Sequence, residues 1–241
     1  TFQYDASNID KVALLLNQEH PDVICLQEFR NHKLPDGSFA LDHLANALGL
    51  PHYRFVHLPV HIHGAAIYSR YPIVQLDTLF MPAKEINSGI LITVESPLGK
   101  VAVGNLHLSS FMVKKTWDEA EGVRAKLTAL YKQARTTIAL QHQKVGTVLE
   151  KTADFHYPLV LTGDMNAVPH SRISFRYRDR FQDAFLTGNN GLGWTFPILK
   201  ITGLRIDYHY FSDPLTVTRF KILRSDISDH YPVVVDYMLD L

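Results

Sequence analysis

Several apolar segments of this sequence run directly into side chains that bind metal ions or transfer protons. These side chains belong to Gln27-Glu28 after residues 23–26, to His107 within residues 101–108, to Gly163-Asp164-Met165-Asn166 after residues 159–161, and to Arg205-Ile206-Asp207-Tyr208 and Ser228-Asp229-His230 near the C-terminus. A carboxylate at the end of a buried strand has a rigid support and faces a cleft, as a ligand of a hard cation must. The chain is therefore expected to bring several strand ends together around one polar site.

Helical and strand-like patterns alternate along the whole chain. The spacing of apolar residues predicts helices over residues 8–20, 39–48 and 116–154. It predicts strands over residues 23–26, 52–58, 65–69, 73–80, 89–96, 101–108, 159–161, 206–211, 215–222 and 232–237. This alternation indicates an α/β sandwich with the sheets in the middle and the helices outside.

Composition limits the classes of function. The 241 residues suit one domain, and the 24 basic residues equal the 24 acidic ones, which argues against an avid non-specific nucleic-acid binder. The single cysteine, Cys25, excludes a disulfide framework and a thiolate zinc cluster. The basic residues of the long helical region are expected on a solvated face; they are Arg124, Lys126, Lys132, Arg135 and Lys144.

Each polar motif has an ordinary structural interpretation when it stands alone. A Gly-Asp-x-Asn tetrad is usually a turn, in which Gly163 would permit the sharp bend, and a histidine at a strand end is usually a hydrogen-bonded structural residue. Taken together and in order, the motifs resemble those of the endonuclease/exonuclease/phosphatase superfamily, from Asp22 to His230. This superfamily includes DNase I-like nucleases, abasic-site endonucleases, inositol-polyphosphate 5-phosphatases and neutral sphingomyelinases.

The resemblance implies a fold and a domain organisation. The fold would be a four-layered α/β/β/α sandwich, with two mainly antiparallel sheets packed face to face and helices outside. Residues 1–241 would form a single domain. Members of the superfamily usually carry an Asn on a strand upstream of the Gln-Glu motif, and Asn8 precedes a predicted helix instead. We therefore expect that this domain lacks its first strand.

The resemblance also implies the chemistry of a divalent-metal-dependent phosphoester hydrolase. Glu28 would be the principal Mg²⁺ ligand, with Asp229 completing the metal environment and Mn²⁺ a possible substitute. Asp164 would position or deprotonate the attacking water, and Asn166 would orient that water or a phosphate oxygen.

Two histidines complete the implied catalytic set. His230 would bind the phosphate or transfer a proton, with Asp207 fixing its tautomer. His107 would act on the phosphate or the leaving oxygen. Gln27, Thr195 and Arg205 would support the site, although Thr195 could equally belong to a packed aromatic turn.

The substrate stays open among nucleic acid, inositol phosphate and phospholipid head group. We expect a monomer without an obligate protein partner, and a soluble domain that is either cytoplasmic or attached to a membrane through a further N-terminal segment.

Three alternatives also follow from the sequence. The chain could be a non-catalytic binding module that keeps the fold. A transition-metal site could use His57, His61 and His63, although a loop with exposed histidines is the simpler interpretation. The Arg- and aromatic-rich residues 172–181 could border the substrate or form an ordinary surface helix.

Overall fold

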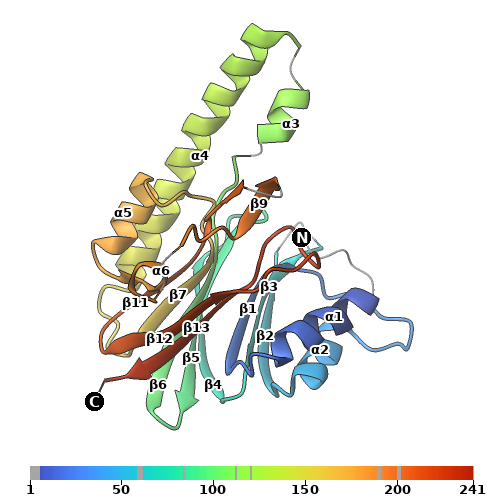
Figure 1. Ribbon diagram of the computed structural model, residues 1–241, viewed down its shortest axis with the longest axis vertical. Coiled ribbons are helices and arrows are strands. Elements are labelled where there is room, and N and C mark those ends of the chain that lie inside the picture. The colour runs from blue at the N-terminus through green and yellow to red at the C-terminus, as the bar shows by residue number, and fades with distance from the viewer. Residues whose placement is uncertain are drawn as a thin grey trace.

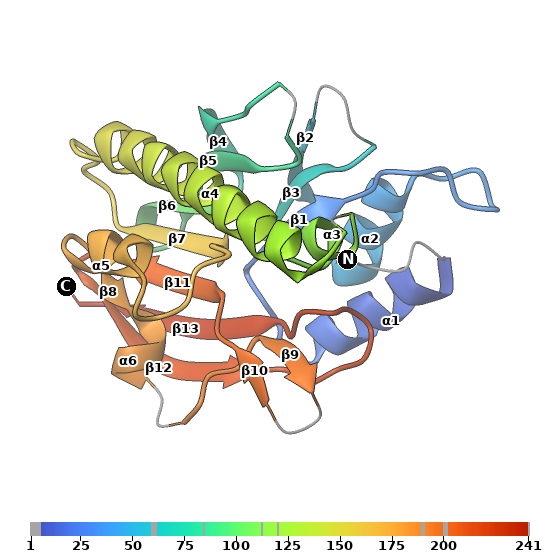
Figure 2. The same ribbon diagram turned by 90° about the horizontal axis from the view of Figure 1, so that it is seen from above.

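The computed structural model describes residues 6–58, 62–83, 85–111, 113–119, 121–188, 191–199 and 202–240. It contains two main β-layers packed face to face (Figures 1 and 2). Helices lie on the outer sides of both layers. The α/β/β/α sandwich expected from the sequence is confirmed.

The larger sheet has six strands, of which β6 and β7 carry two of the predicted site residues. Its order is β4 (Ile73–Phe80), β5 (Ser88–Ser96), β6 (Gly99–His107), β7 (Leu159–Asp164), β11 (Asp207–Phe211) and β8 (Gln182–Asp183). The β6–β7 pair is parallel, and the other neighbours are antiparallel. A parallel pair needs a crossover connection, which here is made by helices α3 (Val113–Asp118) and α4 (Val123–Lys151).

The second layer is divided into two parts. One part is a sheet with the order β1 (Val23–Phe29), β3 (Gly64–Ser69) and β2 (His52–His57), and the other is the hairpin of β12 (Leu215–Ile222) and β13 (Val233–Leu239). A short separate hairpin, β9 (Phe196–Leu199) and β10 (Thr202–Leu204), precedes β11.

Apolar faces hold the layers together. Helices α1 (Ala6–Asn17) and α2 (Ala40–Leu48) share a core cluster with β1 and β3, and Gly49 ends α2 in the left-handed conformation, with φ 65°. Helices α4 and α5 (Arg172–Arg178) share another cluster with the outer face of the large sheet. Helix α6 (Ala184–Gly188) packs beside β12.

An open slot interrupts the second layer between β1 and β13. In the described part of the chain, β1 pairs with β3 alone and β13 with β12 alone. The apolar interior between the layers is correspondingly split into two clusters. A cavity of about 1650 Å³ runs between them to the predicted site, and it is lined by half-exposed apolar side chains such as Val23, Cys25 and Val234.

The structure differs from the sequence-based expectations in several places. The helix expected over residues 116–154 is two helices, because Gly122 lies at φ 77° between them. Lys144 is buried rather than solvated. The short elements α6, β8, β9 and β10 were not predicted, since they are too short to show a period, whereas α5 was one of the two interpretations of residues 172–181. No helix of the described residues is long and apolar enough to cross a membrane.

Candidate active site

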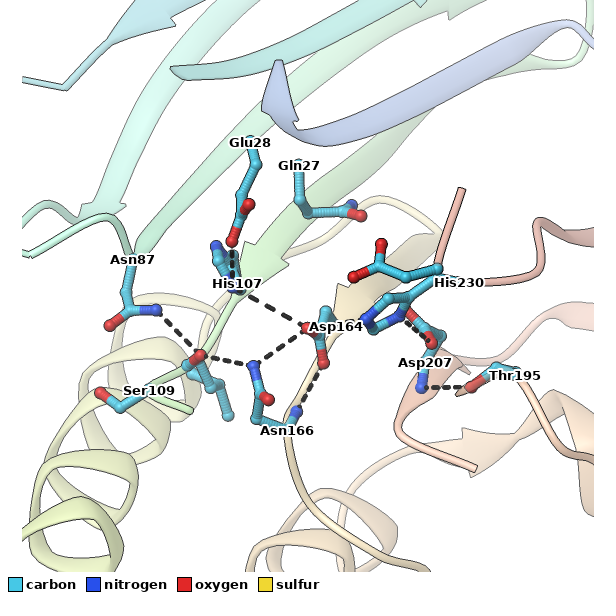
Figure 3. A network of polar contacts seen from close by, with 12 residues as sticks. Gln27, Glu28, Asn87, His107, Ser109, Asp164, Asn166, Thr195, Asp207 and His230 are labelled. Carbon is cyan, nitrogen blue, oxygen red and sulfur yellow. Dashed lines mark hydrogen bonds and ion pairs between the residues drawn. The ribbon is translucent and has the colours of Figure 1, made fainter. Parts of the chain in front are cut away.

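Asp164 lies at the centre of the polar residues, at the end of β7 (Figure 3). The strand register places His107 of β6 opposite Asp164 on one side and Asp207 of β11 opposite it on the other. His107 Nε2 lies 3.8 Å from Asp164 Oδ2. Three neighbouring strands therefore present ionisable side chains at the same height of one sheet edge.

Gly163 sets the close approach of β6 and β7. It has φ 133°, and a Cβ atom added to it would lie 2.0 Å from the carbonyl oxygen of Leu106. No residue larger than glycine fits there without moving the strands apart. The sharp turn expected at Gly163 is wrong, because β7 continues as a strand through Asp164.

His230 and Asp207 form a hydrogen-bonded pair beside Asp164. Asp207 Oδ2 lies 2.8 Å from His230 Nδ1, and His230 Nε2 lies 3.9 Å from Asp164 Oδ2. Thr195 is fully buried beneath the pair, and its Oγ1 accepts the backbone N–H of Asp207 at 3.1 Å. The ring of Phe196 contacts the His230 ring with centroids 5.0 Å apart.

Two of the polar residues adopt left-handed backbone conformations. Asn166 has φ 47°, which lets its backbone N–H and its side-chain Nδ2 bind the two oxygens of Asp164 at 2.8 and 3.0 Å. Glu28 has φ 51° at a bulge of β1, and its Oε1 lies 3.6 Å from His107 Nε2. Such conformations are uncommon outside glycine, and here they aim the side chains into the site.

The protonation behaviour of the site follows from burial and crowding. Burial, together with the nearby Asp207 carboxylate, raises the pKa of Asp164 to about 8. Burial alone would lower the pKa of His230, but the hydrogen bond and charge of Asp207, with the charge of Asp164, raise it to about 9. Burial lowers the pKa of His107 against the opposing charge of Glu28.

The loop after β6 accepts hydrogen bonds from side chains that the sequence analysis missed, those of Asn87 and Gln141. The carbonyl oxygen of Leu108 accepts N–H groups from the Asn87 and Asn166 side chains, both at 2.9 Å. Gln141 of α4 donates through Nε2 to the carbonyls of Ser109 and Asn166, at 2.8 and 3.1 Å. One helix side chain thus joins the loop that follows His107 to the loop that carries Asn166.

Lys144 lies one turn further along the same face of α4. Its ammonium group binds the Glu85 carboxylate, the Ser109 hydroxyl at 2.6 Å and the Asn87 side-chain oxygen at 3.3 Å. The signal for these residues was present in the sequence. Gln141 and Lys144 occupy polar positions within the apolar stripe that includes Val145 and Val148, all of them buried.

The predicted supporting residues act at different distances from the site. The Gln27 side chain donates to Asn105 Oδ1 at 2.6 Å and so ties β1 to the facing sheet. Arg205 is buried, and it makes two hydrogen bonds of 2.8 Å with Asp183 between the rings of Phe185 and Tyr208. Arg205 thus anchors the segment before β11 to β8, whereas Thr195 contacts the Asp207–His230 pair directly.

The group of residues that could bind a metal ion is not the pair of ligands, Glu28 and Asp229, expected from the sequence. Asp164, Asp207 and His230 each place one ligand atom within 4.8 Å of the others, and this is the one such group among the described residues. Glu28 and Asp229 stand outside that group, although both line the same cavity. His57 and His63 also stand outside it, and His61 lies outside the described residues.

The Arg- and aromatic-rich stretch is largely occupied by packing. Its first part forms α5, in which Tyr177 is fully buried. Arg176 and Arg180 donate to backbone carbonyls of α4. Arg172 alone of the arginines in this stretch lines the cavity. The surface-helix interpretation therefore describes most of this segment.

Comparison with known proteins places the chain in a family. The model of the Endonuclease/Exonuclease/phosphatase family matches residues 2–230, and the chain belongs to this family. Its members are phosphoester-cleaving enzymes, as the sequence motifs implied. No curated protein matches the sequence significantly.

Solved structures share the fold at low sequence identity. An endonuclease/exonuclease/phosphatase from Beutenbergia cavernae has a TM-score of 0.70 and 24% identity, over 96% of this chain and 66% of that chain. An endonuclease/exonuclease/phosphatase from Bacteroides vulgatus has a TM-score of 0.68 and 17% identity, over 97% of this chain and 90% of that chain. A mannosyl-6-phosphatase from Bacteroides thetaiotaomicron has a TM-score of 0.63 and 18% identity, over 97% of this chain and 91% of that chain. This chain thus spans just under two thirds of the Beutenbergia chain.

Proposed function

We propose that this protein is a divalent-metal-dependent hydrolase of phosphoester bonds. The observation that carries the proposal is the register of the three neighbouring strands, which brings His107, Asp164 and Asp207 to one sheet edge beside His230. Acidic and imidazole groups at this spacing can both activate water and contact a phosphate group. Family membership supports the same class of reaction.

The donor set fits a hard divalent cation. Carboxylates converge in a buried place, where burial and the nearby Asp207 carboxylate raise the pKa of Asp164, and a cation would stabilise its ionised form. Asp164 and Asp207 would hold the ion through their carboxylate oxygens, and Glu28 and Asp229 would join them. When bound, Mg²⁺ or Mn²⁺ would neutralise charge on the phosphate oxygens during displacement.

The side chains have separate tasks in this proposal. Asp164, fixed at both oxygens by Asn166, positions the attacking water and accepts its proton in the ionised form that a bound cation would favour. His230, held through Nδ1 by Asp207, turns Nε2 toward the phosphate and is protonated at neutral pH because of its raised pKa. His107, with its pKa lowered by burial, contacts the phosphate or the leaving oxygen.

The test is a Mg²⁺-dependent activity screen over abasic DNA, plasmid DNA, inositol phosphates and sphingomyelin. We expect at least one phosphoester to be cleaved, and Asp164→Asn to lower kcat by about a hundredfold or more. If no phosphoester is cleaved, or Asp164→Asn has no effect, the enzyme proposal fails. Titration calorimetry with Mg²⁺ or Mn²⁺ separates the binding-module alternative: an intact metal site should bind the ion, and Glu28→Ala should abolish most of that binding.

The proposal includes one more strand in the second layer. Among the described residues, the edges of β1 and β13 that face the slot have no strand partner, and apolar side chains of the facing sheet line it. A strand placed there would join the three-stranded sheet to the β12–β13 hairpin. Its end would lie between Glu28 and Asp229, so that it would also border the proposed metal site.

A further inference from the structure

The N-terminal half of α4, residues 123–136 and here called its upper half, projects away from the rest of the molecule. Figure 1 shows it rising beyond the strand ends, with α3 beside it. No side chain between residues 123 and 136 is buried, whereas the lower half of the helix packs on the large sheet. The upper half therefore lacks the core contacts that usually hold an amphipathic helix.

This half carries large apolar side chains in open positions. Val123, Leu127 and Tyr131 are 68%, 57% and 63% exposed, and Ile138 is 44% exposed at the edge of the site cavity. Leu127, Tyr131 and Ile138 follow one another at spacings of four and seven residues, so they lie on one face of the helix. Contiguous exposed apolar side chains mark surfaces that contact another body.

The same segment is positively charged. Arg124, Lys126, Lys132 and Arg135 lie among these apolar residues, and no acidic residue occurs between Glu121 and Glu150. The Arg135 guanidinium lies over the Tyr131 ring, 5.8 Å from its centroid. The partner is therefore expected to be anionic as well as apolar.

The β9–β10 hairpin also carries exposed aliphatic side chains that could contact the same partner. It also rises at the end of the molecule that holds the site (Figure 1), and Ile198 and Leu204 on it are 55% and 37% exposed. Two projecting elements beside the polar pocket thus carry aliphatic side chains.

We propose that the upper half of α4 and the β9–β10 hairpin dock onto an anionic lipid membrane surface. Aliphatic and aromatic side chains among Arg and Lys are the composition of helices that lie in the membrane interface. Single-stranded nucleic acid is the less suitable partner, because it is bound by rows of aromatic rings, whereas Tyr131 and the neighbouring Trp117 of α3 stand here among aliphatic side chains. Docking would turn the polar pocket toward lipid head groups. The consequence that head-group phosphoesters are substrates rests on the proposed function.

The test is co-sedimentation with vesicles in EDTA, using the Asp164→Asn variant so that binding is measured without turnover. Vesicles of phosphatidylcholine mixed with phosphatidylserine should bind the protein, and pure phosphatidylcholine should bind it weakly. Leu127→Glu should weaken binding about tenfold or more, because it removes an inserted side chain and adds a repelled charge. Arg135→Gln should weaken it about fivefold.

Leu98→Glu is the matched control. Leu98 is 63% exposed but lies in the β5–β6 turn, at the opposite end of β6 from His107, so binding should not change. An equal loss in Leu98→Glu, no sedimentation with either vesicle, or tighter binding to single-stranded DNA than to the mixed vesicles would overturn the proposal. If the wild-type protein binds the mixed vesicles but cleaves no phosphoester in Mg²⁺, docking is supported and the proposed function is contradicted instead.

Discussion

Oδ2 of Asp207 lies 2.8 Å from Nδ1 of His230, and the opposite nitrogen of the same ring faces Asp164. The carboxylate therefore fixes which imidazole nitrogen points into the pocket. It also keeps the ring charged at a pH where a free histidine is neutral, because the pKa of His230 is raised to about 9.

The Asp207→Asn variant should lower the pKa of His230 toward its ordinary value near 6.5. A neutral amide cannot stabilise the imidazolium as a carboxylate does. The measurement is an NMR titration of the His230 ring in EDTA, assigned with His230→Gln. A midpoint that does not move would show that Asp207 is not the cause.

The same pair predicts a pH dependence of stability. A histidine whose pKa is raised on folding stabilises the folded state fully below pH 6.5, and this contribution is lost as pH rises through about 9. The free energy of unfolding from urea titrations in EDTA should therefore fall more between these pH values in the wild type than in His230→Gln. Equal slopes would contradict the assignment.

Gln141→Leu should lower kcat about ten- to hundredfold while KM changes little. The substitution removes the donor that joins the carbonyls of Ser109 and Asn166, so the two loops lose their common support without losing a catalytic group. The matched control is Gln143→Leu, an exposed position of the same helix. If both variants keep wild-type kcat, Gln141 has no positioning role.

Arg205→Met should destabilise the fold by about 3–5 kcal/mol, because it leaves the Asp183 carboxylate buried without its partner. The double variant Arg205→Met with Asp183→Leu should recover part of that loss. Urea unfolding of the two variants measures the difference. A single variant as stable as the wild type would mean that this buried pair does not hold β8 to the segment before β11.

The slot between β1 and β13 should leave alternate backbone amides of both strands open to exchange. Amides that face β3 or β12 are hydrogen-bonded, whereas those that face the slot have no strand partner in the described structure. Hydrogen exchange by NMR reads this pattern. A synthetic peptide of alternating Val and Thr should slow the fast amides when added, and a version with a central proline should not. Uniformly slow exchange in the protein alone would contradict an open slot.

The strand ends that carry the site could be predicted because each joins two strong signals, an apolar run and a polar group that is costly to bury. Glu28, His107, Asp164 and Asp207 were found in this way, and the main strands followed from their periods. The support by Gln141 and Lys144 depends on where α4 crosses the large sheet, which no local pattern fixes. The grouping of Asp164 with Asp207 and His230, rather than with Glu28, depends on strand register.

The contact between Gly163 and the Leu106 carbonyl has a consequence for how such sites vary. The main-chain atoms of β6 and β7 are already in contact there. The distance between His107 and Asp164 therefore depends on Gly163 having a hydrogen atom in place of a Cβ atom. A chain could keep every acidic and imidazole group and still lose the spacing through one added methyl. The spacing of the proposed site thus depends on Gly163, a residue that has no functional group.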